Sequence, residues 1–362
     1  MSICVNLWLK IIMNILFITS SRIGDAVLSS GLLNHIDQTY PNAKVTIACG
    51  PLAVSLFEGY PKLERIIPMK KASYAGHWRK LWLEVVGTKW DLVVDLRNSV
   101  VSRLIRAQRR YMFGPHIDKR LHKVEQNAAV MALDDVPAPK LWFTDGQLEK
   151  AKALIPRNNM LSQRKPGSRG FEQPDPGLRR DDDLVLGVGP TANWIGKTWP
   201  EERFIEIVQF LTGPGGFMDG ARVAVFAAPG EEEPALKVLH SIPEERRIDV
   251  IAKTSPGEAA ATLARCDFYI GNDSGLMHCA AAGGVPTLGL FGASYPHLYA
   301  PWGEHAHYVR TPETFDELTD YEGYSPETCG CLMESLTVDA VKAKLGEVFS
   351  EHSVIPAQAG TG

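Results

Sequence analysis

Short apolar runs alternate with amphipathic stretches along most of this chain, and the two kinds of segment have the lengths of buried strands and of helices. We predict strands at 14–19, 44–48, 65–68, 91–96, 111–114, 184–188, 222–227, 247–251, 268–270 and 287–292. We predict helices at 26–40, 55–57, 78–86, 99–107, 126–133, 200–211, 231–240, 256–265 and 336–349. Because strands that alternate with helices form parallel sheets, the pattern predicts an α/β fold.

The alternation is interrupted once, between residues 156 and 183, where Pro and Gly recur among Arg and Asp. A chain of 362 residues also fits two domains better than one. We therefore predict an N-terminal domain over 13–155, a linker or loop insertion over 156–183, a C-terminal domain over 184–349 and a disordered tail over 350–362. Residues 1–12 are expected to be dispensable for folding.

A polar turn, Asn272-Asp273-Ser274-Gly275, follows the apolar run 268–270, which we expect to break at Gly271. A helix of small residues then runs to Gly283, and an apolar run begins at Thr287. A strand, turn and helix in this order place the backbone N–H groups of residues 274–277 at a helix N-terminus, where phosphate binds. An ordinary tight turn is the alternative interpretation.

Asp25 follows the first predicted strand, at the edge of an open sheet where ligands bind. A carboxylate there can accept a proton from a substrate hydroxyl, or it can cap the helix that follows. The loop from Ser20 to Leu28 contains one glycine, whereas a nicotinamide-binding loop has three at fixed spacing. The sequence therefore argues against a nicotinamide-dependent enzyme.

Charge is distributed unequally along the chain: residues 1–150 have a net charge of +7, and the remainder has a net charge of −11. A basic N-terminal half suggests an anionic partner, either nucleic acid or an anionic glycolipid. The six cysteines are scattered, and Cys329-Gly330-Cys331 lacks the second pair of a zinc site, so we expect a reduced, cytosolic protein. No apolar run is long enough for a membrane span, although peripheral membrane contact stays open.

Three runs together resemble the lipopolysaccharide heptosyltransferases of glycosyltransferase family 9. They are Ser21-Arg22-Ile23-Gly24-Asp25, the segment Thr191–Phe204 with Lys197-Thr198-Trp199-Pro200, and the run from Asn272 to His278 with its small-residue helix. The resemblance covers roughly residues 13–345 apart from 156–183, which, like Trp194-Ile195, departs from the family pattern. It implies an α/β fold of GT-B architecture, with two Rossmann-like, doubly wound domains facing a central cleft.

The resemblance also implies residue roles. Asp25 would be the catalytic base. The donor would be bound by Thr191, Lys197, Glu231, Asp273, Ser274, Gly275, Leu276 and Met277. The acceptor would be bound by Arg22, Arg97, Arg103, Arg120 and His122. Lys197 has the alternative of a solvated loop lysine, and Glu231 that of a helix N-terminal charge. His278 could be a catalytic base, with a partly buried structural histidine as the favoured alternative.

The implied reaction is inverting transfer of heptose from ADP-heptose to the inner core of lipopolysaccharide, without a metal or other cofactor. Asp181-Asp182-Asp183 has the spacing of a metal-binding Asp-x-Asp, but it lies away from any strand end and is interpreted as a charge run. The expected partners are ADP-heptose, an anionic lipopolysaccharide core acceptor and, peripherally, the inner membrane surface, with no nucleic acid. The expected location is the cytoplasmic face of that membrane. The alternatives are another GT-B nucleotide-sugar transferase or epimerase, and a nucleotide-sugar-binding protein without catalysis.

Overall fold

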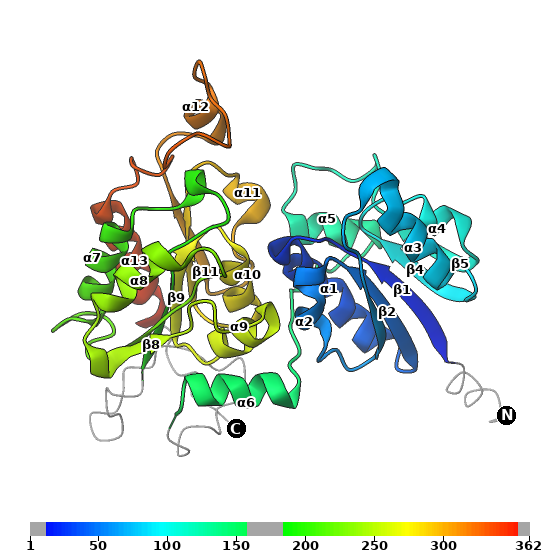
Figure 1. Cartoon of the computed structure of the whole chain (residues 1–362), viewed down its shortest axis with the longest axis horizontal. Helices are drawn as coiled ribbons and strands as arrows, with labels where there is room; N and C mark the ends of the chain where they lie inside the picture. The colour runs from blue at the N-terminus through cyan, green and yellow to red at the C-terminus, as the bar shows by residue number, and fades with distance from the viewer. Residues whose placement is uncertain (1–11, 158–183, 354–362) are drawn as a thin grey trace, which may run out of the picture. The chain divides into compact units, whose positions relative to one another are not determined.

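The structure, a computed structural model, describes residues 12–157 and 184–353, and the chain divides into two compact units (Figure 1). One unit comprises Met1–Glu149 and Ser255–Ala261, and the other comprises Lys150–Thr254 and Thr262–Gly362. The division after Glu149 falls a few residues before the predicted domain end at residue 155. The predicted linker and the Asp181-Asp182-Asp183 run lie outside the described residues, as does most of the predicted tail.

The first unit is built on a parallel sheet in the order β3-β2-β1-β4-β5. Its strands are β1 (Met13–Ile18), β2 (Ala43–Cys49), β3 (Leu63–Pro68), β4 (Trp90–Asp95) and β5 (Ala107–Met112). Its helices are α1 (Ile23–Thr39), α2 (Val54–Phe57), α3 (Gly76–Val85), α4 (Val101–Leu104) and α5 (Lys123–Val130), and α6 (Asp145–Leu154) follows them in the chain. Short 3-10 turns precede α2 (Pro51–Ala53) and α3 (Ser73–Ala75).

The second unit is built on a parallel sheet in the order β11-β10-β9-β6-β7-β8. Its strands are β6 (Val185–Gly189), β7 (Arg222–Val225), β8 (Arg247–Asp249), β9 (Phe268–Asn272), β10 (Thr287–Phe291) and β11 (Ala306–Arg310). The helices in this part of the chain are α7 (Glu201–Thr212), α8 (Glu232–His240), α9 (Pro256–Leu263), α10 (Gly275–Ala282), α11 (Pro296–Tyr299), α12 (Phe315–Thr319) and α13 (Val338–Ser353), with 3-10 turns at Ile195–Lys197 and Glu244–Arg246. Both sheets confirm the predicted α/β class.

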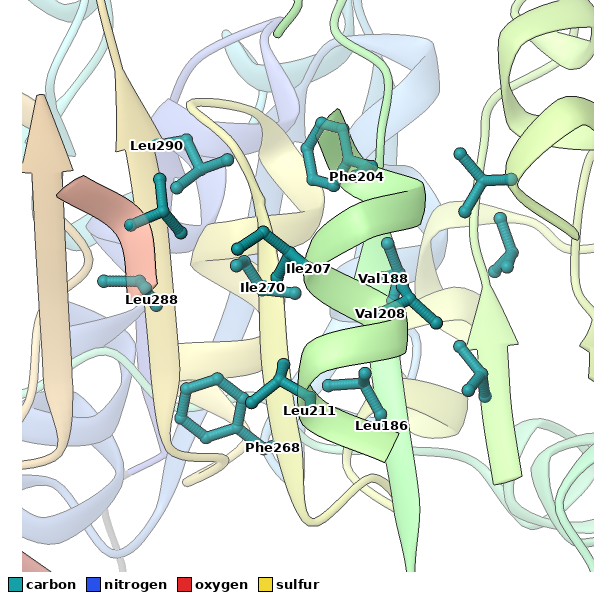
Figure 2. Close-up of a cluster of buried hydrophobic side chains, with 14 of the residues drawn as sticks. Leu186, Val188, Phe204, Ile207, Val208, Leu211, Phe268, Ile270, Leu288 and Leu290 are labelled. Carbon is teal, nitrogen blue, oxygen red and sulfur yellow. The ribbon is translucent and has the colours of Figure 1, made fainter. Parts of the chain in front are cut away.

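The second sheet is stabilised by the burial of an apolar helix face against its strands. Figure 2 shows Phe204, Ile207, Val208 and Leu211 of α7 meeting side chains from three central strands. Those strand residues are Leu186 and Val188 of β6, Phe268 and Ile270 of β9, and Leu288 and Leu290 of β10. The spacing of 204, 207, 208 and 211 is that of one helix face. This packing fixes the strand ends that carry the polar side chains described below.

The helix predicted at 99–107 and the strand predicted at 111–114 were wrong in extent. The helix is one turn, α4, and the chain is extended by Ile105 and enters β5 at Ala107. β5 is an edge strand with three exposed residues, Gln108, Arg109 and Arg110. A charged edge strand discourages pairing with other chains. It also has too few apolar residues for its sequence pattern to predict a strand. The strand β9 also runs through Gly271 to Asn272, because Gly271 pairs with both neighbouring strands.

Candidate functional site

Asp25 lies where β1 joins α1, at the carboxyl edge of the first sheet. The predicted loop ends early, because α1 begins at Ile23 and its N-cap is Arg22, whose side chain makes no capping hydrogen bond. Asp25 is therefore in the first helical turn, where a carboxylate is stabilised by the helix dipole. The Ser20 hydroxyl donates to Asp25 Oδ2 at 3.2 Å and accepts from the Arg22 backbone N–H at 3.2 Å. Asp25 remains half-buried, so the residue is still partly accessible to solvent.

A lysine that the sequence did not single out as a site residue, Lys123, interacts electrostatically with Asp25. α5 packs against α1, and Asn127 Nδ2 donates to the Leu28 carbonyl at 3.1 Å. One turn earlier on α5, Lys123 Nζ donates to Gln126 Oε1 at 2.9 Å. Burial lowers the pKa of the Lys123 ammonium, and attraction to Asp25 partly opposes this shift. Only the packing of the two helices brings this cation to the predicted base.

The turn after β4 places Arg97 at the same sheet edge. Asp95 is fully buried and accepts four hydrogen bonds, from the backbone N–H groups of Arg97 and Ser99 and from the hydroxyls of Ser99 and Ser102. Arg97 is exposed beyond this turn. Arg103 reaches back to the turn, donating to Asn98 Oδ1 at 2.6 Å and to the Ser99 carbonyl at 3.1 Å. Its guanidinium thus stabilises the turn and keeps an exposed face.

The other two predicted acceptor residues lie just before α5. Arg120 is exposed and donates to both carboxylate oxygens of Asp118, and these hydrogen bonds lower the pKa of Asp118 to about 2. His122 is buried and is the N-cap of α5, with Nδ1 accepting from the Val124 backbone N–H at 3.2 Å. Glu125 completes a capping box by accepting from the His122 backbone N–H. His122 therefore has a structural role whatever else it contacts.

In the second unit, Asn272 ends β9 and Asp273 follows it, and both hold the loop that carries Lys197. Asn272 is fully buried, donates to the Pro190 carbonyl at 2.9 Å and accepts from the Trp199 backbone N–H at 3.1 Å. Lys197 Nζ lies 2.5 Å from Asp273 Oδ2, and the Lys197 side chain is 26% exposed. The lysine is therefore paired in a partly buried site and is not a solvated loop lysine. The sequence reasoning missed Asn272, although its position at a strand end was a signal.

The helix α10 begins immediately after Asp273. Its N-cap is Ser274, in an extended backbone conformation and without a side-chain capping hydrogen bond, so Gly275, Leu276 and Met277 form the first turn. Their backbone N–H groups lack acceptors within the helix and point toward the sheet edge. The Met277 side chain is fully buried, so this residue can contribute to a ligand site only through its backbone. His278 is buried one position further along the helix.

Thr191 and Glu231 form a second polar pair in the same unit. The buried Thr191 hydroxyl donates to Glu231 Oε2 at 2.6 Å, which joins the loop after β6 to the turn before α8. Glu231 is the N-cap residue of α8 but makes no side-chain capping hydrogen bond. Pro190, held by Asn272, is adjacent to Thr191. The structure therefore brings Thr191, Glu231, Lys197 and Asp273 to one edge of the sheet.

Two glycines leave room for a buried tyrosine side chain at this edge of the sheet. Tyr269 is fully buried on β9, and its hydroxyl lies over Gly189 at the end of β6 and Gly271 of β9. A Cβ atom on Gly189 would lie 2.0 Å from that hydroxyl, and one on Gly271 would lie 2.4 Å from it. Both positions therefore require the absence of a side chain.

A basic cavity follows β3 in the first unit, and sequence reasoning did not single it out. It has a volume of about 370 Å³, and Lys70, Lys71, His77 and Lys80 are among its lining residues. Among residues 12–157 and 184–353, none of the three lysines has a carboxylate within ion-pair distance. The helix α3 begins at this cavity, and its N-cap Ala75 provides no side-chain cap. The adjacent Lys70-Lys71 pair after a predicted strand was the available signal.

Two further features were sought within the described residues. No group of three or more His, Cys, Asp or Glu side chains is arranged to hold a metal ion in that part of the chain. Nor does any helix there combine the length and the apolar composition needed to cross a membrane.

Comparison with known proteins identifies the family. A family model described as glycosyltransferase family 9 (heptosyltransferase) matches residues 78–323. This chain belongs to glycosyltransferase family 9. Lipopolysaccharide heptosyltransferase 2 of Salmonella typhimurium is 25% identical to this family 9 chain, covering 94% of it and 100% of the relative. Lipopolysaccharide heptosyltransferase 2 of Escherichia coli is 24% identical, covering 82% and 88% respectively.

Solved structures of family 9 glycosyltransferases share the fold. The E. coli ADP-heptose lipopolysaccharide heptosyltransferase II structure superimposes with a TM-score of 0.67 at 21% identity, covering 94% of this chain and 99% of that one. A family 9 glycosyltransferase from Veillonella parvula gives a TM-score of 0.70 at 18% identity, covering 94% and 98%. An E. coli heptosyltransferase solved with ADP gives 0.64 at 20% identity, covering 93% and 100%. The resemblance inferred from three sequence runs, and the GT-B class of α/β fold that it implied, are confirmed.

Proposed function

We propose that this family 9 glycosyltransferase transfers heptose, with inversion, from ADP-heptose to the inner core of lipopolysaccharide. The observation that carries the proposal is the Lys197–Asp273 pair in front of the first turn of α10. A diphosphate would compete with Asp273 for the Lys197 ammonium and accept hydrogen bonds from the N–H groups of residues 275–277. Relatives named as lipopolysaccharide heptosyltransferases, and one solved with ADP, support this donor.

Asp25 is proposed to deprotonate the acceptor hydroxyl. That oxygen then bonds to the anomeric carbon while the bond from that carbon to the diphosphate oxygen breaks, so one step inverts the configuration. Ser20 holds one carboxylate oxygen of Asp25, which fixes its orientation at the sheet edge. Negative charge develops on the departing ADP, where Lys197 and the α10 terminus would stabilise it. We propose that no metal takes part. Thr191 and Glu231 would contact the donor from the neighbouring loop.

The acceptor is proposed to bind along the carboxyl edge of the first sheet. Arg22, Arg97, Arg103 and Arg120 present exposed guanidinium groups near this edge, and His122 would act by holding the start of α5. The cavity containing Lys70, Lys71 and Lys80 lies after β3, so it belongs to the same edge of the parallel sheet. Clustered cations suit the phosphates and carboxylates of a lipopolysaccharide core. We therefore propose peripheral association with the cytoplasmic face of the inner membrane, where such a glycolipid is exposed.

A thermal-shift comparison of ADP, UDP and GDP tests the donor class. A ligand that binds only the folded protein raises its melting temperature according to concentration and affinity. We expect ADP to stabilise the wild-type chain more than UDP or GDP at equal concentration, and Lys197→Ala to remove most of that stabilisation. Lys197→Arg, which keeps the charge, should retain part of it. Equal shifts with the three nucleotides would contradict an adenine-nucleotide donor.

A further inference from the structure

The turn that carries Lys197 is held at both of its ends by one later segment, Ser325–Met333. Before the turn, Trp194 Nε1 donates to the Pro326 carbonyl at 2.7 Å. After the turn, the Cys331 thiol donates to the Thr198 carbonyl with sulfur and oxygen 3.2 Å apart. Both contacts lie within the second unit, and each joins residues more than 130 positions apart in the sequence.

The turn is small, so fixing its ends fixes its centre. The backbone N–H of Lys197 donates to the Trp194 carbonyl, and that of Thr198 donates to the Ile195 carbonyl, both at 3.0 Å. The Trp194 ring covers Gly196, where a Cβ atom would lie 2.5 Å from the ring. The Trp194 ring therefore packs directly against the turn that carries Lys197. The hydrogen bond to Pro326 holds the ring in that position.

The holding segment is itself well anchored. The backbone N–H groups of Thr328 and Cys329 both donate to the Ser325 carbonyl, which closes a helical turn. The backbone N–H of Met333 donates to the Cys331 sulfur at 3.3 Å, and the Met333 side chain is fully buried. Burial raises the pKa of the Cys331 thiol, so it stays protonated near neutral pH and remains a donor to Thr198. The segment can therefore act as a fixed reference for the Lys197 turn.

We propose that Trp194 and Cys331 are positioning residues that set where the Lys197 ammonium meets the diphosphate of the donor. The inference rests on the proposed function, in which Lys197 contacts that diphosphate. Neither residue need touch the donor, because each acts through the backbone of the turn. Loss of either contact frees one end of the turn and leaves Lys197 paired with Asp273 in a wider range of positions. Donor binding and the rate of diphosphate departure should fall together, whereas acceptor binding should not change.

The full-length variants Trp194→Phe, Cys331→Ala and Cys331→Ser test this role. Phenylalanine keeps a ring over Gly196 but removes the N–H donor, and serine keeps a donor where alanine has none. Cys329→Ala is the matched control, because it removes a thiol whose hydrogen bond stays within its own turn, with the sulfur 3.7 Å from the Pro326 oxygen, and leaves that oxygen as the acceptor for Trp194. Calorimetric ADP affinity, donor KM, acceptor KM, kcat and melting temperature are measured for each variant.

We expect Trp194→Phe and Cys331→Ala to weaken ADP binding and raise donor KM about 2- to 10-fold, the range for loss of one neutral hydrogen bond. The kcat should fall in both variants, acceptor KM should stay at the wild-type value, and Cys331→Ser should recover part of the loss. Wild-type donor kinetics in both variants would overturn the inference. An equal rise in acceptor KM, or loss of donor affinity only in step with melting temperature, would also overturn it by indicating a general structural effect.

Lys197→Ala, measured in the same series, separates this inference from the proposed function. If Lys197→Ala binds ADP like the wild type, the proposed donor contact fails. If Lys197→Ala loses affinity while Trp194→Phe and Cys331→Ala do not, the donor contact stands and the positioning role fails.

Discussion

At the residue scale, two acidic side chains at the edge of the first sheet differ in how many hydrogen bonds their carboxylate oxygens accept. Asp95 is fully buried, and its carboxylate accepts four hydrogen bonds, one at Oδ1 and three at Oδ2. Asp25 is half-buried and, among the described residues, accepts one side-chain hydrogen bond, from Ser20. Only Asp25 can take up a proton from a substrate without breaking the turn that holds it.

We expect Asp25→Asn to reduce heptosyl transfer by about 10²–10⁴-fold, the usual cost of losing a general base. ADP affinity should stay within a few-fold of wild type, because the proposed donor contacts lie in the other unit. Asp95→Asn is the comparison variant. It replaces one carboxylate oxygen by an amide NH2, which must face at least one of the four donors, so it should lower the melting temperature more than Asp25→Asn does. Near-normal turnover by purified Asp25→Asn would contradict the assignment.

We expect Gly189→Ala to destabilise the protein by about 1–3 kcal/mol, the usual cost of inserting a methyl group into a packed site. The new Cβ would meet the Tyr269 hydroxyl. Tyr269→Phe removes that oxygen, so the double variant should recover part of the loss. Urea unfolding of the two single variants and the double variant measures the coupling. Additive effects would show that the hydroxyl does not set the requirement for glycine.

At the element scale, the short helix α4 and the edge strand β5 are joined by an arginine. The Arg110 guanidinium on β5 donates to the carbonyls of Ser102, Ile105 and Ala107, at 2.8, 2.6 and 3.1 Å. These carbonyls come from the end of the helix and the link to the strand, where intrahelical partners run out. Arg110 therefore belongs to the fold of this corner through these hydrogen bonds, although it is exposed like its neighbour Arg106.

We expect Arg110→Ala to destabilise the first unit by about 1–2 kcal/mol, in the range for hydrogen bonds to a charged donor. Arg106→Ala should change stability little, because among the described residues this exposed side chain makes no hydrogen bonds of the kind that Arg110 makes. Chemical denaturation would measure the loss of stability, and hydrogen exchange of residues 101–112 would show whether it is local to this corner. Equal stability of the two variants would contradict the structural role of Arg110.

At the scale of the whole molecule, the two parts of the chain differ in charge. Residues 1–150 carry a balance of +7, and residues 151–362 carry −11. The basic cavity after β3 and the exposed arginines belong to the first part, whereas the proposed donor contacts in the second rely on one lysine and a helix terminus. Exposed charges attract a ligand over about 8 Å at physiological salt, and more salt shortens that range.

We therefore expect acceptor KM to rise with salt more steeply than donor KM. Steady-state kinetics with a phosphorylated acceptor, at several salt concentrations, would give both slopes. A double variant, Lys70→Gln with Lys71→Gln, should flatten the acceptor slope and leave the donor slope unchanged. Equal slopes for the two substrates in the wild-type protein would mean that the charge asymmetry does not serve acceptor recognition.

The sequence by itself determined most strands, most helices and the positions of polar residues at strand ends, but it did not predict the edge strand β11. Apolar periodicity reports burial directly, and parallel strands bring their carboxyl ends to one edge, so Asp25, Thr191, Glu231 and Asp273 could be predicted to lie at sheet edges. The periodicity failed at β5, because an exposed edge strand buries little apolar surface.

Only the tertiary structure decided the partners of these residues. Lys197 meets Asp273 across 76 positions, and Cys331 meets Thr198 across 133. Asn272 selects Pro190 and Trp199, and Lys123 comes to Asp25 through the packing of α5 on α1. Such contacts depend on strand register and helix packing, which are set by the burial of the whole core. A local pattern of residues carries no information about which distant segment that burial brings alongside.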